Sequence, residues 1–388
     1  MSERPVAVNV PSVARVAVTP RALHIEWANG ALSEFASVWL RDNRPADRDP
    51  HNGQRLIDVA DLPQDPRLHS AVLHAGRLLV EWEGESPPSA FEPGWLAQHA
   101  PGRTPQSRAP APRPWLEGAT LDAARDFAWA TLAAVRSDPA MRLDWLERLL
   151  ADGIGFLSGV PCEDTALVEA MTLVGRVSET NYGLVFDVRS VPQPENLAYS
   201  DLGLGLHTDN PYREPVPGFQ ALHVLIASRD GGSSLFADGF AIAQELRDRD
   251  PTAFALLTST AVPFDYRSRD AELHAERPLI QLSCRGEIAA VHYNNRSIAP
   301  LPLAAGELAA GELAAFYAAY RLFGELLRES RFQLRLQLAD GDLVVFDNQR
   351  ILHGRTAFSS ARHARHLRGC YLSRDSVHSQ AALLRRLR

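Results

Sequence analysis

Residues 341–355 read GDLVVFDNQRILHGR, and this stretch places a strand, a turn and a histidine in close succession. The run 342–347 is apolar and β-prone, as expected of a short buried strand. The strand ends at Asp347-Asn348, where the chain turns. His353 follows in a position to bind a metal ion together with ligands from elsewhere in the chain.

A second segment, GLHTDNPYREPVPG at 205–218, supplies the other ligands. His207 and Asp209 are separated by one residue, so in an extended segment both side chains leave the same face. With His353 they form a set of two imidazoles and one carboxylate, which suits Fe(II) and leaves coordination positions open for substrates. A zinc hydrolase uses similar ligands, so these three residues alone do not define the reaction.

A third segment, SSARHARHLRGCYL at 359–372, distinguishes the two chemistries. Its Arg365 can point back into a barrel from a returning strand, where its planar guanidinium would pair with a carboxylate. A zinc hydrolase has no general need for such a group, whereas an enzyme that binds 2-oxoglutarate must hold a distal carboxylate. Arg362 and Arg368 are local alternatives for the same task.

The surrounding sequence predicts a mainly β domain with helices packed outside an antiparallel sheet. Strands are expected at 221–228, 234–238, 288–294 and 342–347, and amphipathic helices at 121–135, 142–153 and 311–330. A jelly roll is one member of this class, but the spacing alone does not choose it over other β-barrels.

A change in composition divides the chain. Residues 101–114, PGRTPQSRAPAPRP, are rich in proline and predict a linker between a domain at 1–100 and a second domain at 115–388. The first domain is expected to be small and β-rich, with strands at 22–27, 37–40 and 77–82.

The bulk properties exclude several classes of protein. A net charge of −7 argues against broad nucleic-acid binding. The three cysteines are far apart, so a disulfide framework is not expected and a reducing compartment fits better. No apolar run approaches the length of a membrane-spanning helix, and the N-terminus has no signal-peptide pattern. The sequence therefore predicts a cytoplasmic protein without a membrane partner.

The chain resembles the γ-butyrobetaine hydroxylase branch of the taurine dioxygenase-like superfamily, from WLRDN at 39–43 to CYLSRD at 370–375. The resemblance rests on H-T-D, D-N-x-R-x-x-H-G-R and R-H-L-x-G-x-Y, found in that order. It implies a double-stranded β-helix (jelly-roll) catalytic core and commonly a homodimer. It also implies that His207, Asp209 and His353 bind Fe(II), and that Arg365 binds 2-oxoglutarate with Ser234 beside it. O2 would be the second cosubstrate and ascorbate the reductant.

The same resemblance suggests the substrate. Relatives hold a trimethylammonium group in a cage of aromatic rings, since such a cation cannot donate a hydrogen bond. The matching positions are Tyr182, Phe186, Tyr199 and Tyr371 for the cage, and Asn196 with Asn294 or Asn295 for the polar end. Asn210 stands where the animal enzymes carry tyrosine. The implied reaction is hydroxylation of γ-butyrobetaine to L-carnitine. Alternatives are trimethyllysine or a trimethylammonium phosphonate as substrate, or a jelly-roll metal-binding module without catalysis.

The first domain departs from this family. Relatives bind a structural zinc through cysteines after WLRDN, but here those positions hold Arg44, Ala46 and Asp49. No structural zinc is therefore expected, and the domain should be held by its apolar core alone, with help from a second protomer as an option.

Overall fold

The computed structural model describes residues 12–102, 110–115, 126–189, 202–228, 230–301, 310–358 and 365–388. The chain divides into two compact units, residues 1–107 and 108–388, and each is described by itself. Within the described residues, no helix is long and apolar enough to cross a membrane.

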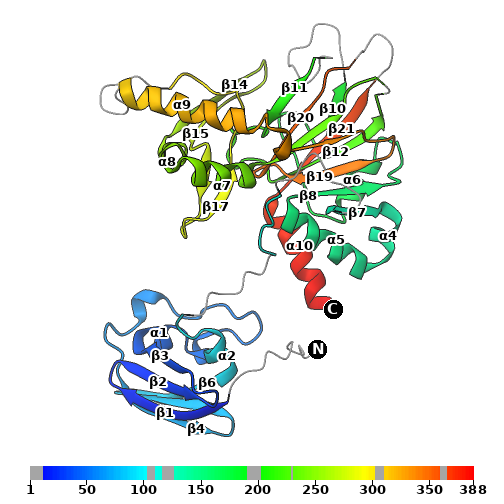
Figure 1. Cartoon of the computed structure of the whole chain (residues 1–388). Coiled ribbons are helices and arrows are strands. Elements are labelled where there is room, and N and C mark those ends of the chain that lie inside the picture. Colours follow the sequence, from blue (N-terminus) through cyan, green and yellow to red (C-terminus); the bar gives the residue numbers. More distant parts are fainter. Residues whose placement is uncertain are drawn as a thin grey trace. The chain divides into compact units, whose positions relative to one another are not determined.

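Unit 1 contains two three-stranded antiparallel sheets and two short helices (Figure 1). The elements are β1 (Val13–Thr19), β2 (Ala22–Trp27), β3 (Leu32–Ala36), α1 (Ser37–Asp42), η1 (Pro45–Asp47), η2 (Val59–Asp61), β4 (Leu68–His74), β5 (Arg77–Trp82), β6 (Glu85–Phe91) and α2 (Pro93–Gln98). Along β5, Leu78, Val80 and Trp82 are buried at every second position, as one covered face of a sheet requires. These side chains form one apolar core with those of β2 and α2.

The prediction of a strand at 37–40 is wrong, because these residues begin helix α1. Ser37, Leu40 and Arg41 are the buried residues, at the three- and four-residue spacing of a helix, while Val38 is 51% exposed. Four residues are too few to show which period the chain follows.

The prediction that an apolar core alone holds unit 1 is also wrong, because a cluster of charges is buried beside that core. The Arg41 guanidinium lies 2.7 Å from the Asp47 carboxylate and 2.9 Å from that of Glu85. Arg44 lies 2.6 Å from Asp47. Each charge of the cluster therefore has an opposite charge within contact.

Unit 2 is built on two facing sheets. The larger sheet has the order β10-β21-β12-β19-β8-β7, with β9 also paired to β21, and the smaller has the order β11-β20-β13-β18. Their bounds are β7 (Ala128–Thr131), β8 (Ile154–Ser158), β9 (Val177–Ser178), β10 (Phe186–Arg189), β11 (Leu204–His207), β12 (Phe219–Ile226), β13 (Ser234–Asp238), β18 (Gln333–Leu336), β19 (Leu343–Asp347), β20 (Ile351–Arg355) and β21 (His366–Leu372). All pairings are antiparallel except β7 with β8. This is the double-stranded β-helix, or jelly roll, that the resemblance implied.

Strand β19 shows why its sequence is apolar throughout. Val344 and Phe346 pack into the core between the sheets, with Phe236 of β13. Leu343 and Val345 point the other way and pack against the helices on the outer face. Both faces of the strand are covered, which explains the apolar run from Leu343 to Phe346; the buried Asp347 at its end is paired with Arg374 at 2.9 Å.

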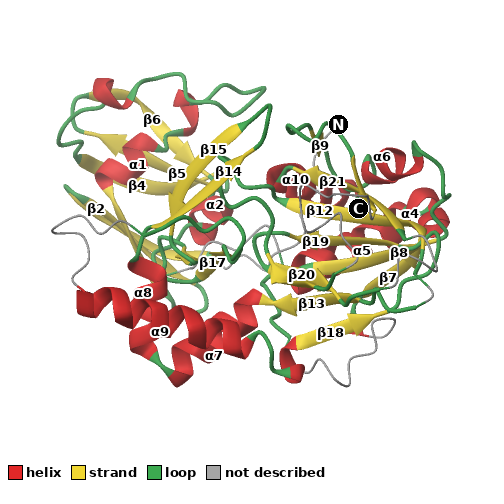
Figure 2. Cartoon of the chain, turned by 90° about the horizontal axis from the view of Figure 1, so that it is seen from above, coloured by secondary structure: helices red, strands yellow, loops and turns green. Residues whose placement is uncertain are grey.

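Two groups of helices flank the sheets (Figures 1 and 2). The core on the outer face of the larger sheet includes α4 (Leu132–Ser137), α5 (Pro139–Asp152), α6 (Ala166–Met171) and α10 (Arg374–Leu387). The other group contains α7 (Gly239–Arg249), α8 (Pro251–Ser259) and α9 (Ala310–Leu326), with hairpins β14 (Val262–Arg267)–β15 (Glu272–Arg277) and β16 (Ile280–Leu282)–β17 (Ile288–Val291). The short helix η4 (Ser330–Phe332) leads into β18.

The helix predicted at 121–135 is only partly correct. Residues 121–125 lie outside the described residues, Ala128–Thr131 form strand β7, and the helix α4 begins at Leu132. Thr131 caps this helix by accepting a hydrogen bond from the Ala134 N–H at 3.1 Å. Pairing with β8 therefore determines the conformation of residues 128–131 more strongly than the helical periodicity of their sequence does.

A buried arginine joins three distant segments of unit 2. Arg350, 2% exposed, lies 2.7 Å from the Asp238 carboxylate. It also donates to the carbonyl oxygens of Ala151 at 2.7 Å and Arg113 at 2.9 Å. Arg113 falls within the predicted linker, so the last residues of that segment pack on the jelly roll.

Candidate active site

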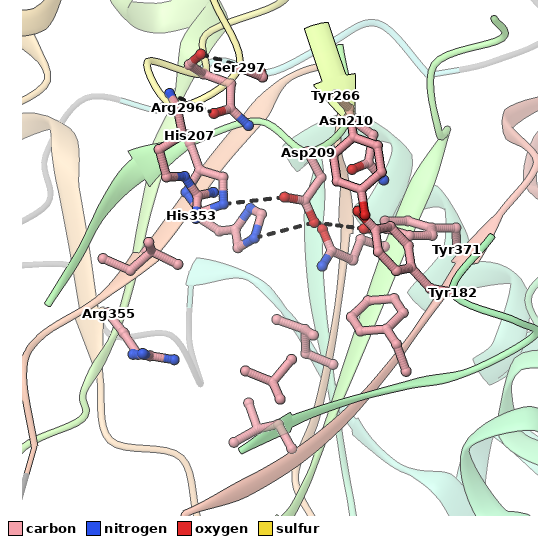
Figure 3. A pocket seen from close by; sticks show the side chains of 18 of the residues that line it. Tyr182, His207, Asp209, Asn210, Tyr266, Arg296, Ser297, His353, Arg355 and Tyr371 are labelled. Atoms are coloured by element: carbon pink, nitrogen blue, oxygen red, sulfur yellow. Dashed lines mark hydrogen bonds and ion pairs between the residues drawn. The ribbon is translucent and has the colours of Figure 1, made fainter. Parts of the chain in front are cut away.

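The three predicted metal ligands meet in unit 2 at one end of the smaller sheet (Figure 3). His207 ends β11, His353 lies in β20, and the antiparallel register pairs these two residues directly. Asp209 follows two residues after His207. One ligand atom from each residue lies within 4.8 Å of the others, which is compact enough to surround one ion.

The ligands have the protonation states that a metal ion requires. His207 Nδ1 lies 2.8 Å from the Gly205 carbonyl oxygen, so Nδ1 carries the proton and Nε2 faces Asp209, 3.2 Å from Oδ1. Burial, and second to it the proximity of the His207 ring, lowers the pKa of His353 to about 3, so the His353 imidazole is neutral. Burial alone would raise the pKa of Asp209, but the histidines and a hydrogen bond from Tyr371 hold it well below its ordinary value.

Buried hydrogen bonds fix the ligand segment. The Asn348 side chain accepts from the Asp209 N–H at 2.7 Å and donates to the Asp209 carbonyl oxygen at 3.0 Å. The Thr208 N–H donates to the Tyr293 carbonyl oxygen at 2.8 Å. The asparagine of the D-N-x-R motif therefore positions a ligand through its backbone.

Arg365 lies in the same pocket, immediately before β21, and is 8% exposed. Its guanidinium carbon is 5.7 Å from the centre of the Phe358 ring, and it forms no hydrogen bond or ion pair with any described residue. Burial and the nearby charge of Arg355 lower the pKa of Arg365 to about 10, so it remains a cation at neutral pH. Since a buried cation is stable only with an opposite charge, Arg365 is a candidate to bind an anionic ligand.

Gly232 makes room for this arginine. It has φ of +66°, and a Cβ at this position would lie 3.2 Å from Arg365 Cδ. Ser234, two residues later, also lines the pocket and pairs in register with Arg355. Of the alternatives to Arg365, Arg368 is bonded to Asp187 and Asp164, and Arg362 lies outside the described residues.

Aromatic rings form another wall of the pocket. Of the predicted cage residues, the structure brings Tyr182, Phe186 and Tyr371 together. The ring centres are 6.3 Å apart for Tyr182 and Phe186, and 5.1 Å apart for Phe186 and Tyr371. Tyr199 and Asn196 lie outside the described residues. Tyr371 also donates its hydroxyl to Oδ2 of Asp209 at 2.8 Å, so it contacts the metal site as well.

Two further tyrosines enlarge this wall. Tyr212 and Tyr266 stack with ring centres 4.9 Å apart, and Tyr266 meets Tyr182 edge to face at 6.0 Å. The Tyr212 hydroxyl donates to Asn210 Oδ1 at 2.6 Å. Asn210, with φ of +55°, thus fixes the position of the Tyr212 hydroxyl.

The amides predicted for the polar end already have partners inside the protein. Asn294 lines the pocket, but its Nδ2 donates to the Thr208 carbonyl oxygen at 3.0 Å and its Oδ1 accepts from the Arg296 N–H at 3.1 Å. Asn295 is bonded to the hydroxyls of Tyr293 and Tyr320. It is absent from the described residues that line the pocket.

The pocket has a volume of about 410 Å³, which is enough for a small ligand beside a cosubstrate. Sequence reasoning missed several of its lining residues: Tyr212, Gln220, Tyr266, Arg296, Ser297 and Arg355. Arg355 belongs to the quoted H-G-R motif and was a visible candidate. The others carry no local signal.

A jelly roll with two histidines, one carboxylate and a nearby arginine that has no ion pair among the described residues is typical of Fe(II)- and 2-oxoglutarate-dependent dioxygenases. The comparisons agree. Residues 118–371 match the family described as taurine catabolism dioxygenase TauD, TfdA family, and the chain belongs to that family.

Similar proteins extend over almost the whole chain. A γ-butyrobetaine dioxygenase of Pseudomonas sp. strain AK-1 is 36% identical, covering 97% of each chain. The γ-butyrobetaine dioxygenase of Homo sapiens is 28% identical and covers 94% of each. A trimethyllysine dioxygenase of Meyerozyma guilliermondii is 26% identical, covering 94% of this chain and 93% of its own.

Proposed function

We propose that this dioxygenase hydroxylates γ-butyrobetaine to L-carnitine. The observation that carries the proposal is the wall of aromatic rings beside the candidate iron ligands, because such rings bind a trimethylammonium group through cation–π attraction. The similarity to γ-butyrobetaine dioxygenases supports it.

In this proposal His207, Asp209 and His353 hold Fe(II), which when bound activates O2 together with a 2-oxo acid for attack on an unreactive C–H bond. Arg365 pairs with the distal carboxylate of 2-oxoglutarate, and Ser234 lies beside it. Tyr371 keeps its proton, because burial and the Asp209 carboxylate raise its pKa well above the ordinary value. It therefore donates to Asp209 throughout and fixes the carboxylate.

The aromatic residues orient the substrate. Tyr182, Phe186 and Tyr371, with Tyr199 from the family pattern, would surround the cationic head and exclude water from it. Fixing the head determines which carbon faces the metal, and such positioning is a large part of an enzyme's contribution.

Trimethyllysine is the second candidate substrate, because a trimethyllysine dioxygenase is also similar over most of the chain and this substrate carries the same cation. A panel that contains γ-butyrobetaine, trimethyllysine and a trimethylammonium phosphonate tests both. Each compound is incubated with enzyme, Fe(II), 2-oxoglutarate and ascorbate, and a mass gain of one oxygen is measured. We expect the highest kcat/KM for γ-butyrobetaine. Succinate formation without oxygenation of any panel member would contradict the proposal.

We also propose a cytoplasmic homodimer, as the amino-acid composition and the resemblance suggest. Light scattering on the purified full chain measures its mass, and a monomer at micromolar concentration would contradict the dimer. Omission of ascorbate should reduce the number of turnovers if it is the reductant.

A further inference from the structure

The substrates proposed above carry an anionic group as well as a cation, and that group also needs a partner. Four arginines line the pocket: Arg267, Arg296, Arg355 and Arg365. Arg365 is assigned to the cosubstrate, and Arg355 lies beside it, 5.3 Å from the centre of the same Phe358 ring. Arg267 is bonded to Glu272 on the exposed end of a hairpin. Arg296 remains to be explained.

The Arg296 side chain is exposed at the pocket and forms no hydrogen bond or ion pair with any described residue. It belongs to the turn that follows β17, and this turn is fixed from both sides. The Arg296 N–H donates to Asn294 Oδ1, and Asn294 in turn donates to Thr208, the residue between two candidate metal ligands. The guanidinium is thus free to bind a ligand while its backbone is held beside the metal site.

The direction of the side chain supports this function. Arg296 is drawn on the His207 side of the metal site in Figure 3, across Asp209 from Tyr182 and Tyr371. A zwitterion placed across the site would therefore meet rings at its cationic end and a guanidinium at its other end.

The amides of Asn294 and Asn295 fit this task less well than a guanidinium, because they carry no charge and because Asn295 is not among the described residues that line the pocket. We propose that Arg296 binds the anionic group of a zwitterionic trimethylammonium substrate and so determines specificity for it. The inference rests on the proposed function and adds the recognition of the second charge. A guanidinium pairs with carboxylate or phosphonate oxygens alike, so the shared chemistry is an oxyanion.

Arg296→Gln tests the inference, with Arg267→Gln as a matched control that removes a neighbouring pocket charge. KM and kcat are measured for γ-butyrobetaine, for its neutral carboxamide and for the phosphonate of equal length. Loss of a charge-assisted bond should raise KM for the two anionic compounds about ten- to hundred-fold. KM for the carboxamide should change less than about twofold, as should KM for 2-oxoglutarate. Arg296→Lys should restore part of the loss because it keeps the charge.

Three outcomes would overturn the inference. Equal changes for charged and neutral compounds would mean that Arg296 only shapes the pocket. A raised KM for 2-oxoglutarate would place the residue at the cosubstrate instead. If the wild-type enzyme oxygenates none of the three compounds, the proposed function itself fails, and that result is distinct because it does not involve the variants. A large increase in KM for the carboxylate compound alone, or for the phosphonate compound alone, supports the inference and identifies which oxyanion Arg296 binds.

Discussion

Both units of the chain bury charged side chains, but they satisfy them in different ways. In unit 1, Arg41 and Asp47 are each 7% exposed and contact each other, with Glu85 and Arg44 completing the cluster. In unit 2, Arg365 is 8% exposed and has no anion among the described residues. Asp209 faces two imidazoles across a space that suits an ion. Arg41 and Arg365 are about equally buried, so what distinguishes the structural cluster from the candidate ligand site is whether the protein itself supplies the opposite charge.

The largest effect is expected at the metal site. Asp209→Ala should abolish succinate formation from 2-oxoglutarate, because two imidazoles alone hold Fe(II) weakly. The metal-free protein should still fold, but its unfolding midpoint should fall modestly, because the substitution removes the acceptor of the buried Tyr371 hydroxyl. The assay is run without added halide, so that no halide ion replaces the missing carboxylate. Near-normal turnover under these conditions would show that Asp209 is not a ligand.

Arg365→Ala is expected to have the next largest effect. Removal of one member of a buried charge pair costs about 3–5 kcal/mol, so the apparent KM for 2-oxoglutarate should rise at least about a hundred-fold. The matched control is Arg368→Ala, whose guanidinium is occupied by Asp187 and Asp164. If instead Arg368→Ala raises this KM and Arg365→Ala does not, the cosubstrate site has been assigned to the wrong arginine.

Removal of a buried charge in unit 1 should instead lower the stability of that unit and leave the enzyme kinetics unchanged. Asp47→Ala leaves Arg41 and Arg44 to share the Glu85 carboxylate, so local stability should fall by about 3 kcal/mol. Hydrogen exchange of residues 37–47 measures the loss, while KM for 2-oxoglutarate stays constant. Asp65→Ala, at an exposed pair with Arg21, should leave stability nearly unchanged.

The same cluster predicts a pH dependence. The arginines overcome the effect of burial and lower the pKa of Asp47 in the folded state. The contribution of the Asp47 carboxylate to folding stability is therefore complete above its pKa in the unfolded state, about 4. It is lost as the pH falls through its lower pKa in the folded state. Protection of residues 37–47 that is unchanged between about pH 6 and 3 would contradict this.

The smallest effect is expected at the aromatic wall. The wild-type enzyme should use γ-butyrobetaine about five- to hundred-fold better than its neutral tert-butyl isostere. Tyr182→Leu should narrow this preference, because it removes one ring face and keeps apolar bulk. Tyr182 is a better choice than Tyr371, whose hydroxyl also holds Asp209. Equal use of both compounds by the wild-type enzyme would show that the rings are ordinary core.

The sequence predicted that His207, Asp209 and His353 come together, because the information for this grouping is local. His207 and Asp209 share a face by spacing, and His353 follows a strand whose apolar run is unmistakable. Arg296 and Tyr266 could not be predicted in this way. Tyr266 reaches the pocket from the β14–β15 hairpin, and Arg296 from a turn fixed by hydrogen bonds to Thr208, so both depend on tertiary contacts far apart in the sequence.

The errors in the fold have the same origin. The segment 37–40 was too short to show a period, and 128–131 form a strand only because β8 lies beside them. Asn294 and Asn295 looked alike in the sequence, and only the structure shows where each amide is bonded. Residue type and spacing therefore indicate which kind of chemistry the site can perform. The hydrogen bonds and ion pairs within the fold determine which side chains remain available for it.

The contact between Arg350 and the Arg113 carbonyl oxygen has a consequence for protein engineering. An expression fragment of the catalytic unit that starts at residue 115 would lack one of the groups that solvate this guanidinium in the interior. Arg113 itself also pairs with Asp152 at 2.6 Å and would be lost with it. A fragment that starts at or before residue 108 keeps both contacts, so the useful cloning boundary lies several residues before the jelly roll begins.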